Sequence, residues 1–99
     1  MAVIEVLTFR LDSQTEEAEF LAADKRVQTE FFYQQPGLVR RTTARGDDGG
    51  WLVVSLWGSQ ANADASGSLF GSSSSPAVSD LLRLIDASTV ETRRYTTLD

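Results

Sequence analysis

One acidic residue, Asp24, falls where the sequence otherwise predicts a buried helix face. On a helical projection of about 100° per residue, Phe20, Val27 and Phe31 form an apolar stripe with Asp24 in its middle. A carboxylate on a buried face costs several kcal/mol of stability unless it is paired or neutral. Asp24 is therefore either a pocket carboxylate that acts as a general base, or one half of an ion pair with a strand arginine. A cleft between helix and sheet that opens at Asp24 would allow both.

Two residues near the end of the chain are candidate hydrogen-bond donors beside such a base. Arg93 and Tyr95 alternate along a predicted strand and share one of its faces, while Arg94 takes the other. A guanidinium or a phenol hydroxyl at a reactive centre stabilises a developing enolate or phenolate. The structural alternatives are an ion pair for the arginine and an interface position for the tyrosine. Asp24, Arg93 and Tyr95 are thus the candidate catalytic residues.

Aromatic residues are numerous enough to line a pocket for a planar ligand. Trp51 and Trp57 lie on one face of a predicted strand, where two indole rings can sandwich a flat molecule. The same rings can instead fill the core beneath the helices, and the sequence leaves both interpretations open. The candidate substrate-binding residues are Trp51, Trp57, Phe9, Phe20 and Phe31.

Composition excludes several kinds of chemistry. The 99 residues include no cysteine and no histidine, so disulfides, thiolate nucleophiles and histidine-based metal sites or bases are not expected. A net charge of −5 argues against nucleic acid and against an anionic membrane surface as partners. The first residues lack a basic segment followed by a long apolar run, so we expect neither a signal peptide nor a membrane span. We therefore expect a cytoplasmic protein without metal or cofactor.

The chain alternates between β-rich and helical segments. A Ser-x-x-Glu capping pattern at Ser13 opens the first helix, and Pro36-Gly37 stops it. A Gly/Ser-rich loop is expected at 67–75, followed by an N-cap and a proline that open the last helix. Strands are expected at Val3–Leu11, Leu38–Arg45, Trp51–Trp57 and about Thr89–Leu98. The first helix is expected to run from the capping pattern at Ser13 to about Gln34, and a short second helix over Gln60–Ser66. The last helix is expected to begin at Pro76 and to carry an apolar stripe of Val78, Leu81, Leu82 and Ile85.

This order predicts an α+β fold of the ferredoxin-like type, β-α-β-β-α-β, as one domain over residues 1–99. Right-handed crossovers place the first and third strands in the centre of the antiparallel sheet. The segment Trp51–Trp57 is apolar on both faces, because Leu52, Val54 and Leu56 oppose Trp51, Val53 and Trp57. Helices of one chain cover only one face of such a sheet. A second copy is the simplest cover for the other, so we expect a homodimer that forms an α/β barrel.

Short motifs agree with this architecture. The sequence Pro36-Gly37-Leu38-Val39-x-Arg41 precedes a Gly-rich turn, and Trp51-x-Val53-x-x-x-Trp57-x-Ser59-x-x-x-Ala63 follows it. With the element order, these residues resemble the dimeric α/β-barrel superfamily, and within it the antibiotic-biosynthesis-monooxygenase-like branch. The resemblance covers nearly the whole chain. It implies a homodimer with a small-molecule pocket between sheet and helices in each chain.

The resemblance also bears on which of the family's activities this chain could have. Haem-degrading members use an axial histidine, which this chain lacks. Cofactor-free monooxygenases that act on aromatic polyketides share the tryptophan that ends the third strand, here Trp57, but have an asparagine where this chain has Val53. Two functions follow as hypotheses. The first is a cofactor-independent oxygenase or related oxidoreductase acting on a hydrophobic aromatic or polyketide-like molecule. The second is a non-catalytic binding or structural dimer of the same fold.

Overall fold

An antiparallel sheet of four strands is the frame of the computed structural model, which describes residues 1–72 and 75–98. The strand order is β2-β3-β1-β4, so β1 and β3 are central, as predicted. The ferredoxin-like fold class is therefore confirmed. The elements are β1 (Val3–Leu11), α1 (Glu17–Glu30), the 3-10 helix η1 (Phe32–Gln34), β2 (Leu38–Arg45), β3 (Trp51–Trp57), α2 (Gln60–Ser72), α3 (Pro76–Arg83) and β4 (Ile85–Thr96).

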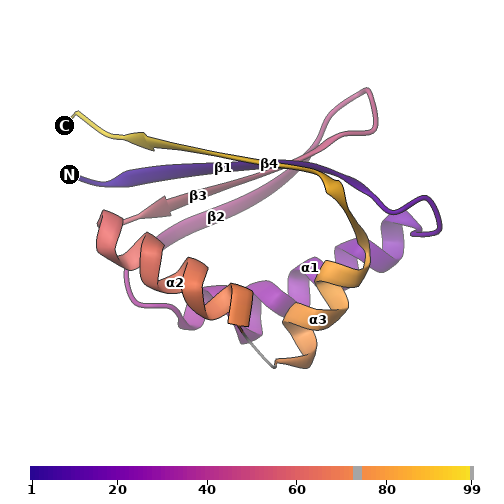
Figure 1. Cartoon of the computed structure of the whole chain (residues 1–99), viewed down its shortest axis with the longest axis horizontal. Coiled ribbons are helices and arrows are strands. Elements are labelled where there is room, and N and C mark those ends of the chain that lie inside the picture. The colour runs from indigo at the N-terminus through magenta and orange to yellow at the C-terminus, as the bar shows by residue number, and fades with distance from the viewer. Residues whose placement is uncertain (73–74, 99) are drawn as a thin grey trace.

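The helices α1, α2 and α3 all lie on the same side of the sheet (Figure 1). The N- and C-terminal ends lie side by side at one end of it, where the amide of Thr97 donates to the carbonyl of Ala2 at 2.9 Å. Within the described residues the other face of the sheet has no helix over it. No helix in this part of the chain is both long and apolar enough to cross a membrane.

The strand β3 shows both apolar faces that the sequence predicted. Trp51, Val53 and Trp57 are buried under the helices, while Leu52, Val54 and Leu56 on the open face are only half-buried. Ser55 interrupts the buried row and is itself 6% exposed. The inner face of the sheet therefore carries a polar group in the middle of an otherwise apolar strand.

The main core lies where α1 and α3 pack on the sheet. Phe20 and Val27 of α1 are fully buried, as their shared stripe predicted. The ring of Phe20 meets Phe9 edge to face at 5.6 Å and Trp51 at 4.8 Å between centroids. A second, smaller cluster around Trp57 lies beside α2, with Val3 and Ala63. The space between these two clusters belongs to the cavity described below.

The first helix is shorter than predicted at both ends. Ser13 does not cap it, because the carboxylate of Asp12 accepts the amide of Gln14 and forms a turn that delays the helix to Glu17. The helix also stops at Glu30 rather than continuing to Gln34, and a 3-10 turn follows. That break lets the consecutive rings of Phe31 and Phe32 pack against each other at 5.0 Å, and both reach α2.

The second helix is longer than predicted. Residues 67–72 were expected in a Gly/Ser loop but continue α2 to Ser72, whereas residues 73 and 74 of that predicted loop lie outside the described residues. Phe70 is the cause, since its ring packs on Phe31 at 5.4 Å and on Phe32 at 5.3 Å. Tertiary packing thus overrides the weak helix propensity of two glycines.

The last strand begins earlier than predicted, at Ile85 instead of about Thr89. Ile85 and Asp86 pair with Leu11 and Arg10, so Ile85 ends the helical stripe by entering the sheet. Leu82 of that stripe is 48% exposed, although it lines the edge of the cavity. The register with β1 shifts between Thr8 and Arg10, which pair with Glu91 and Asp86, so the segment 87–90 interrupts the regular pairing of β4.

Replacement of Phe20 by alanine tests this core. We expect Phe20→Ala to lower the free energy of unfolding by about 3–5 kcal/mol, because the ring is fully buried between two aromatic neighbours. Urea titration followed by tryptophan fluorescence measures the change. Leu21→Ala, at the adjacent half-exposed position, is the control and should change stability by less than about 1 kcal/mol. Equal losses for the two variants would contradict the packing described.

Candidate functional site

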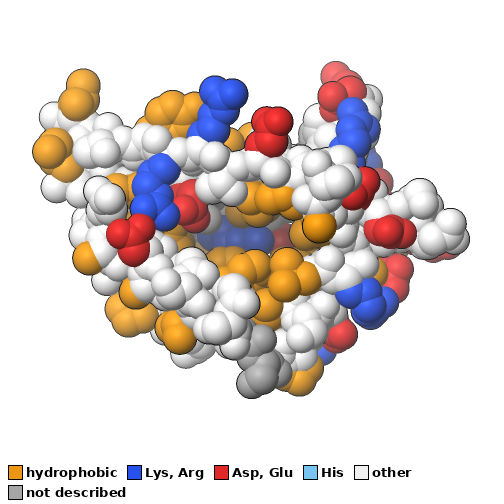
Figure 2. All heavy atoms as spheres, viewed as in Figure 1, with side chains coloured by type: hydrophobic (Ala, Val, Ile, Leu, Met, Phe, Trp, Pro, Cys, Tyr) orange, Lys and Arg blue, Asp and Glu red, His pale blue; other side chains and the backbone are white. Residues whose placement is uncertain are grey.

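A cavity of about 560 Å³ lies between the sheet and the helices. Figure 2 shows its opening as a hollow bordered by hydrophobic side chains, with basic and acidic atoms at its back. All four strands, α1, α2, α3 and η1 contribute to its wall. The volume falls within the range of about 300–1,000 Å³ that is usual for small-molecule sites.

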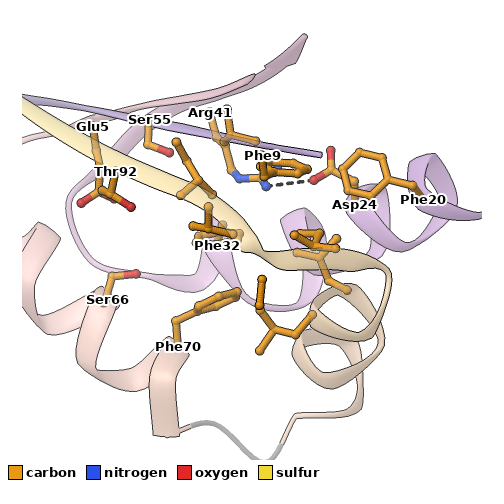
Figure 3. A pocket seen from close by; sticks show the side chains of 18 of the residues that line it. Glu5, Phe9, Phe20, Asp24, Phe32, Arg41, Ser55, Ser66, Phe70 and Thr92 are labelled. Atoms are coloured by element: carbon orange, nitrogen blue, oxygen red, sulfur yellow. Dashed lines mark hydrogen bonds and ion pairs between the residues drawn. The ribbon is translucent and has the colours of Figure 1, made fainter. Parts of the chain in front are cut away.

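Most of the cavity wall is apolar. Trp57 and Val53 come from β3, Phe32 from η1 and Phe70 from α2, and Figure 3 shows the rings of Phe32 and Phe70 on the helix side. Gly67 of α2 also lines the cavity, and a Cβ atom built there would meet no atom within 4 Å. A side chain at this position of α2 would therefore have open space beside the cavity.

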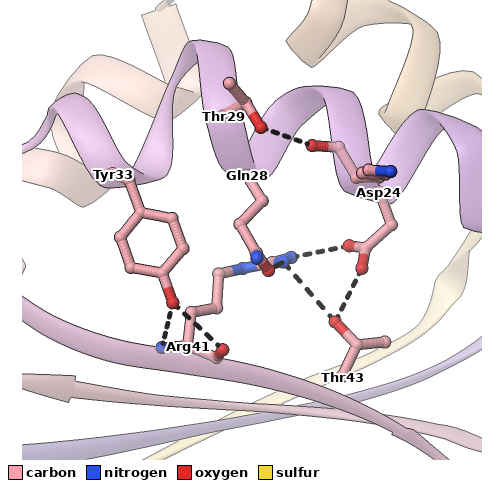
Figure 4. Close-up of polar contacts among 7 residues, drawn as sticks. Asp24, Gln28, Thr29, Tyr33, Arg41 and Thr43 are labelled. Atoms are coloured by element: carbon pink, nitrogen blue, oxygen red, sulfur yellow. Dashed lines mark hydrogen bonds and ion pairs between the residues drawn. The ribbon is translucent and has the colours of Figure 1, made fainter.

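A buried ion pair closes one end of the cavity. Arg41 Nη2 of β2 donates to Asp24 Oδ1 of α1 at 2.9 Å, and the Thr43 hydroxyl donates to Asp24 Oδ2 at 2.7 Å (Figure 4). Asp24 is 7% exposed and Arg41 is 6% exposed, and both line the cavity. The sequence left open whether Asp24 is a pocket carboxylate or one half of an ion pair. In the structure it forms an ion pair with Arg41 and also lines the cavity.

The Arg41 guanidinium makes further contacts besides those with Asp24. Its Nη1 donates to the Gln28 side-chain oxygen at 3.2 Å, and its central carbon lies 4.5 Å from the centre of the Phe32 ring, a cation–π distance. The Tyr33 hydroxyl accepts from the backbone amide of Arg41 at 3.2 Å, which fixes the strand beneath. These contacts come from α1, η1 and β2, so the charge has one fixed position in the cavity wall.

A bulge in β2 brings Arg41 to the inner face. Leu38 pairs with Trp57, but Arg40 pairs with Leu56, so one extra residue, Val39, is accommodated between them. Without that residue, the period-two alternation of the strand would place Arg40 inside and Arg41 on the open face. The bulge therefore determines which arginine of β2 meets Asp24.

A polar row crosses the inner face of the sheet. Ser55 of β3 pairs with Arg41 of β2 on one side and with Glu5 of β1 on the other, and Glu5 pairs with Arg94 of β4. Arg41, Ser55 and Glu5 all line the cavity. The sheet thus presents a guanidinium, a hydroxyl and a carboxylate in sequence beneath an otherwise apolar space.

The carboxylate end of this row is tied to α2. Arg94 Nη2 donates to Glu5 Oε2 at 2.8 Å, and Arg94 Nη1 donates to Asp64 of α2. Hydrogen bonds to Asp64 and then to Glu5 raise the pKa of Arg94 above its usual value, so the guanidinium stays charged. The three side chains together link β1, β4 and α2 beside the cavity.

Two donors in the site whose own atoms are closed to solvent, Arg41 Nε and Trp57 Nε1, have no hydrogen-bond partner among the described residues. Unpartnered buried polar groups are uncommon in folded proteins and concentrate where water, an ion or a ligand belongs. In the same part of the chain, no group of three or more acidic side chains is arranged to hold a metal ion. The polar groups of the site therefore suit an organic ligand better than a metal.

The structure brings part of the sequence-predicted site together. Asp24, Trp57, Phe9 and Phe20 line the cavity. Trp51 and Phe31 do not line it and pack in the core behind it. Trp51 is thus a core residue, whereas Trp57 belongs to the second core cluster and also lines the cavity.

Arg93 and Tyr95 lie away from this site. Arg93 pairs with Val6 and Tyr95 with Ile4, so both side chains belong to the open face of the sheet. Neither lines the cavity, and Tyr95 is 52% exposed. Within one chain they cannot donate to a molecule bound beside Asp24. The assignment of these two residues as donors there does not fit the structure, because the register of β4 turns Arg94 inward instead.

Sequence reasoning missed several residues of the site. Arg41 was one of several strand arginines, and only the bulge at Val39 distinguishes it. Ser55 had a readable signal, since it is a polar residue in the buried period of an apolar strand. Ser66 lay at the end of the predicted helix and gave no signal that it faces a cavity, whereas Phe70 was overlooked because that helix was predicted to end at Ser66.

Comparison with known proteins agrees with the fold. No protein-family model and no curated protein matches the chain. Among solved structures, a variant of SnoaB, a cofactor-independent oxygenase from Streptomyces nogalater, has a TM-score of 0.77 and 25% identity over 99% of this chain and 94% of that one. A candidate antibiotic biosynthesis monooxygenase from Caulobacter crescentus has a TM-score of 0.76 and 16% identity, covering 99% and 91% of the two chains. Another from Chloroflexus aurantiacus has a TM-score of 0.69 and 16% identity, covering 100% and 95%.

These similarities confirm the resemblance to the antibiotic-biosynthesis-monooxygenase-like branch of the dimeric α/β-barrel superfamily at the level of the fold. Proteins of this fold include an oxygenase that needs no cofactor. The fold alone does not assign an activity, because one architecture supports many functions.

Loss of Asp24 tests the ion pair. We expect Asp24→Ala to cost about 3–5 kcal/mol of unfolding free energy, because it leaves the Arg41 charge buried without its partner. The double variant Asp24→Leu with Arg41→Met removes both charges and should be more stable than the single variant. Urea unfolding measures all three proteins.

The matched control is Glu17→Ala, which removes the partner of Arg45 in an exposed ion pair. Its cost should be below about 1 kcal/mol. If Asp24→Ala cost no more than this control, the Arg41 guanidinium would be solvated rather than buried.

Proposed function

We propose that this protein binds a hydrophobic, planar small molecule in the cavity between the sheet and the helices. The observation that supports this most strongly is the cavity itself, about 560 Å³ of mainly apolar space with fixed polar groups at its floor. Aromatic side chains from β3, η1 and α2 provide flat surfaces for an aromatic ligand. A core that merely filled the fold would not leave such a volume open.

Within this function we propose chemistry of the cofactor-independent oxygenase type. SnoaB, which has the same fold and 25% identity, is an oxygenase of this kind. In such a reaction the substrate supplies the electrons that reduce O₂, and the protein supplies a dry site that favours the substrate anion. The buried guanidinium of Arg41 suits that task, because it can stabilise a negative oxygen of an enolate or phenolate.

Asp24 suits a positioning role better than the role of general base. Both of its oxygens already accept hydrogen bonds, from Arg41 and from Thr43. Protonation of Asp24 would also remove the negative charge that pairs with the buried guanidinium of Arg41, which disfavours transfer of a ligand proton to it. We therefore propose that Asp24 fixes the guanidinium of Arg41, and that Trp57 and Phe9 form part of the wall around the ligand.

A non-catalytic binding protein is the second candidate function. The presence of Val53 where the related oxygenases carry an asparagine supports it, since that amide is absent from the wall here. The same cavity and the same ligand class serve both candidates. They differ only in whether O₂ is consumed when the ligand is bound.

We also propose that the protein is a homodimer joined through the open sheet face. Ile4 and Val6 of β1 and Val54 and Leu56 of β3 form an apolar surface there that helices of the same chain do not cover. Burial of such a surface against a second copy is favourable by about 25 cal/mol for each Å² removed from water. An isologous contact between two such faces would close the barrel.

Filling the cavity tests the binding function. We expect wild-type protein to bind 2-naphthol, with a rise in melting temperature and quenching of tryptophan fluorescence, because any ligand of the native state stabilises it. Gly67→Leu should abolish both effects while leaving the protein folded, since its side chain enters the open space beside α2.

The control for this variant is Gly71→Leu, at a second glycine of α2 that does not line the cavity and is equally free of close neighbours. It should bind 2-naphthol as wild type does. Oxygen uptake with a panel of polycyclic phenols then separates the two candidates, because the oxygenase consumes O₂ in the wild type but not in Gly67→Leu. Binding that survives in Gly67→Leu would place the ligand elsewhere and contradict the proposal.

Charge on the open face tests the dimer. Val54→Lys should convert a dimeric wild type into a monomer in sedimentation velocity, because the new ammonium would be buried between two sheets. Leu69→Lys, at an exposed position of α2, should leave the dimer intact. A wild type that sediments as one chain at micromolar concentration would refute the dimer.

A further inference from the structure

The floor of the cavity contains polar groups that no part of the described chain satisfies. The hydroxyls of Ser55 and Ser66 make no hydrogen bond to any described residue, although the two residues are only 6% and 3% exposed. Both line the cavity. Figure 3 shows Ser55 on the sheet and Ser66 on α2, with their oxygens directed into the space between.

A third polar side chain, that of Glu5, lies beside the hydroxyls of Ser55 and Ser66. Its Oε2 accepts from Arg94, whereas Oε1 accepts from no described residue, and the side chain lines the cavity. Figure 3 places Glu5 with Ser55 and Ser66 at one end of the cavity, and Asp24 with Phe20 at the other. The contact with Arg94, itself held by Asp64, keeps the carboxylate in one orientation.

The chemistry of these groups defines their partner. A carboxylate oxygen only accepts hydrogen bonds, so it needs a donor, and the two serine hydroxyls can donate or accept as required. The Glu5 side chain is 27% exposed and all three side chains line the cavity, so a ligand hydroxyl can reach these groups and form hydrogen bonds with them. An aromatic hydroxyl is the donor that a largely apolar cavity lined by aromatic rings accommodates at least cost.

At the opposite end of the polar row, Arg41 needs a hydrogen-bond acceptor rather than a donor. The guanidinium of Arg41 carries only donors, and its ion pair with Asp24 holds it in place, so it favours a carbonyl or phenolate oxygen of the ligand. Arg41 and Glu5 lie on β2 and β1 with β3 between them, so their backbones are about 10 Å apart, or two strand spacings. That separation matches the length of two or three fused aromatic rings.

We propose that Glu5, Ser55 and Ser66 form a second polar subsite that selects a ligand hydroxyl. The ligand class is then a fused-ring aromatic compound with a hydrogen-bond acceptor at the Arg41 end and a hydroxyl at the Glu5 end. This inference rests on the proposed function and adds the identity and placement of the ligand's polar groups. Glu5 acts here as a specificity-determining residue.

Two probes of equal shape test the subsite: 2-acetyl-6-hydroxynaphthalene and 2-acetyl-6-methylnaphthalene. Both offer an acetyl oxygen to Arg41, and they differ only by hydroxyl against methyl at the far end. Wild type should bind the hydroxyl probe at least about tenfold more tightly, as measured by tryptophan quenching, because its hydroxyl meets a charged acceptor.

Glu5→Gln should reduce that preference to about threefold or less. Arg94 needs an acceptor and will hold the amide oxygen, so the new NH₂ group faces the cavity in place of the carboxylate oxygen. Glu16→Gln makes the same charge change on the exposed surface at the start of α1 and should keep the full preference. Ser66→Ala, which removes a buried hydroxyl without disturbing any described contact, should weaken the hydroxyl probe about threefold and leave the methyl probe unchanged.

The outcomes separate this inference from the function on which it rests. If wild type binds both probes equally, or if Glu5→Gln keeps a tenfold preference, the subsite is refuted while the binding function stands. If neither probe binds wild type, the binding function fails and the subsite fails with it. If Glu5→Gln does not fold, Ser66→Ala decides, and equal loss for both probes overturns the subsite.

Discussion

The contact between Asp24 and Arg41 fixes α1 over the edge strand β2, and the site depends on it. A buried carboxylate and a buried guanidinium tolerate separation poorly, because each would then lose its charge partner away from water. Their contact holds α1 at the distance from β2 that the Arg41 and Asp24 side chains span together. The bulge at Val39 makes this arrangement possible by turning Arg41 inward.

The cavity remains open because large residues hold its walls apart and small residues line it. Phe70 of α2 packs against Phe31 and Phe32 and supports α2 at a distance from the sheet. Ser55 on the sheet and Gly67 on α2 are small residues that line the space between them. The result is an apolar space above a polar row of guanidinium, hydroxyl and carboxylate, which matches a flat molecule with polar groups at both ends.

The element order and the sheet topology could be predicted from the sequence, because strand alternation and turn residues are local signals. The buried stripe of α1 was equally readable, and it exposed Asp24 as an exception with two possible explanations. The register in which the strands pair could not be predicted from the sequence. The inward positions of Arg41 and Arg94, in place of Arg40 and Arg93, depend on one bulge and on pairings between residues far apart in the chain. The length of α2 was missed for a related reason, since only its contact with Phe31 and Phe32 makes a glycine-containing segment helical.

A crystal structure of the protein grown with 2-acetyl-6-hydroxynaphthalene tests the central claim most directly. The account predicts density for the flat ring system between the sheet and α2, with its acetyl oxygen toward Arg41 and its hydroxyl within hydrogen-bond distance of Glu5. Density for the probe on the open sheet face, or a cavity closed by α2 packed directly against Ser55, would contradict it.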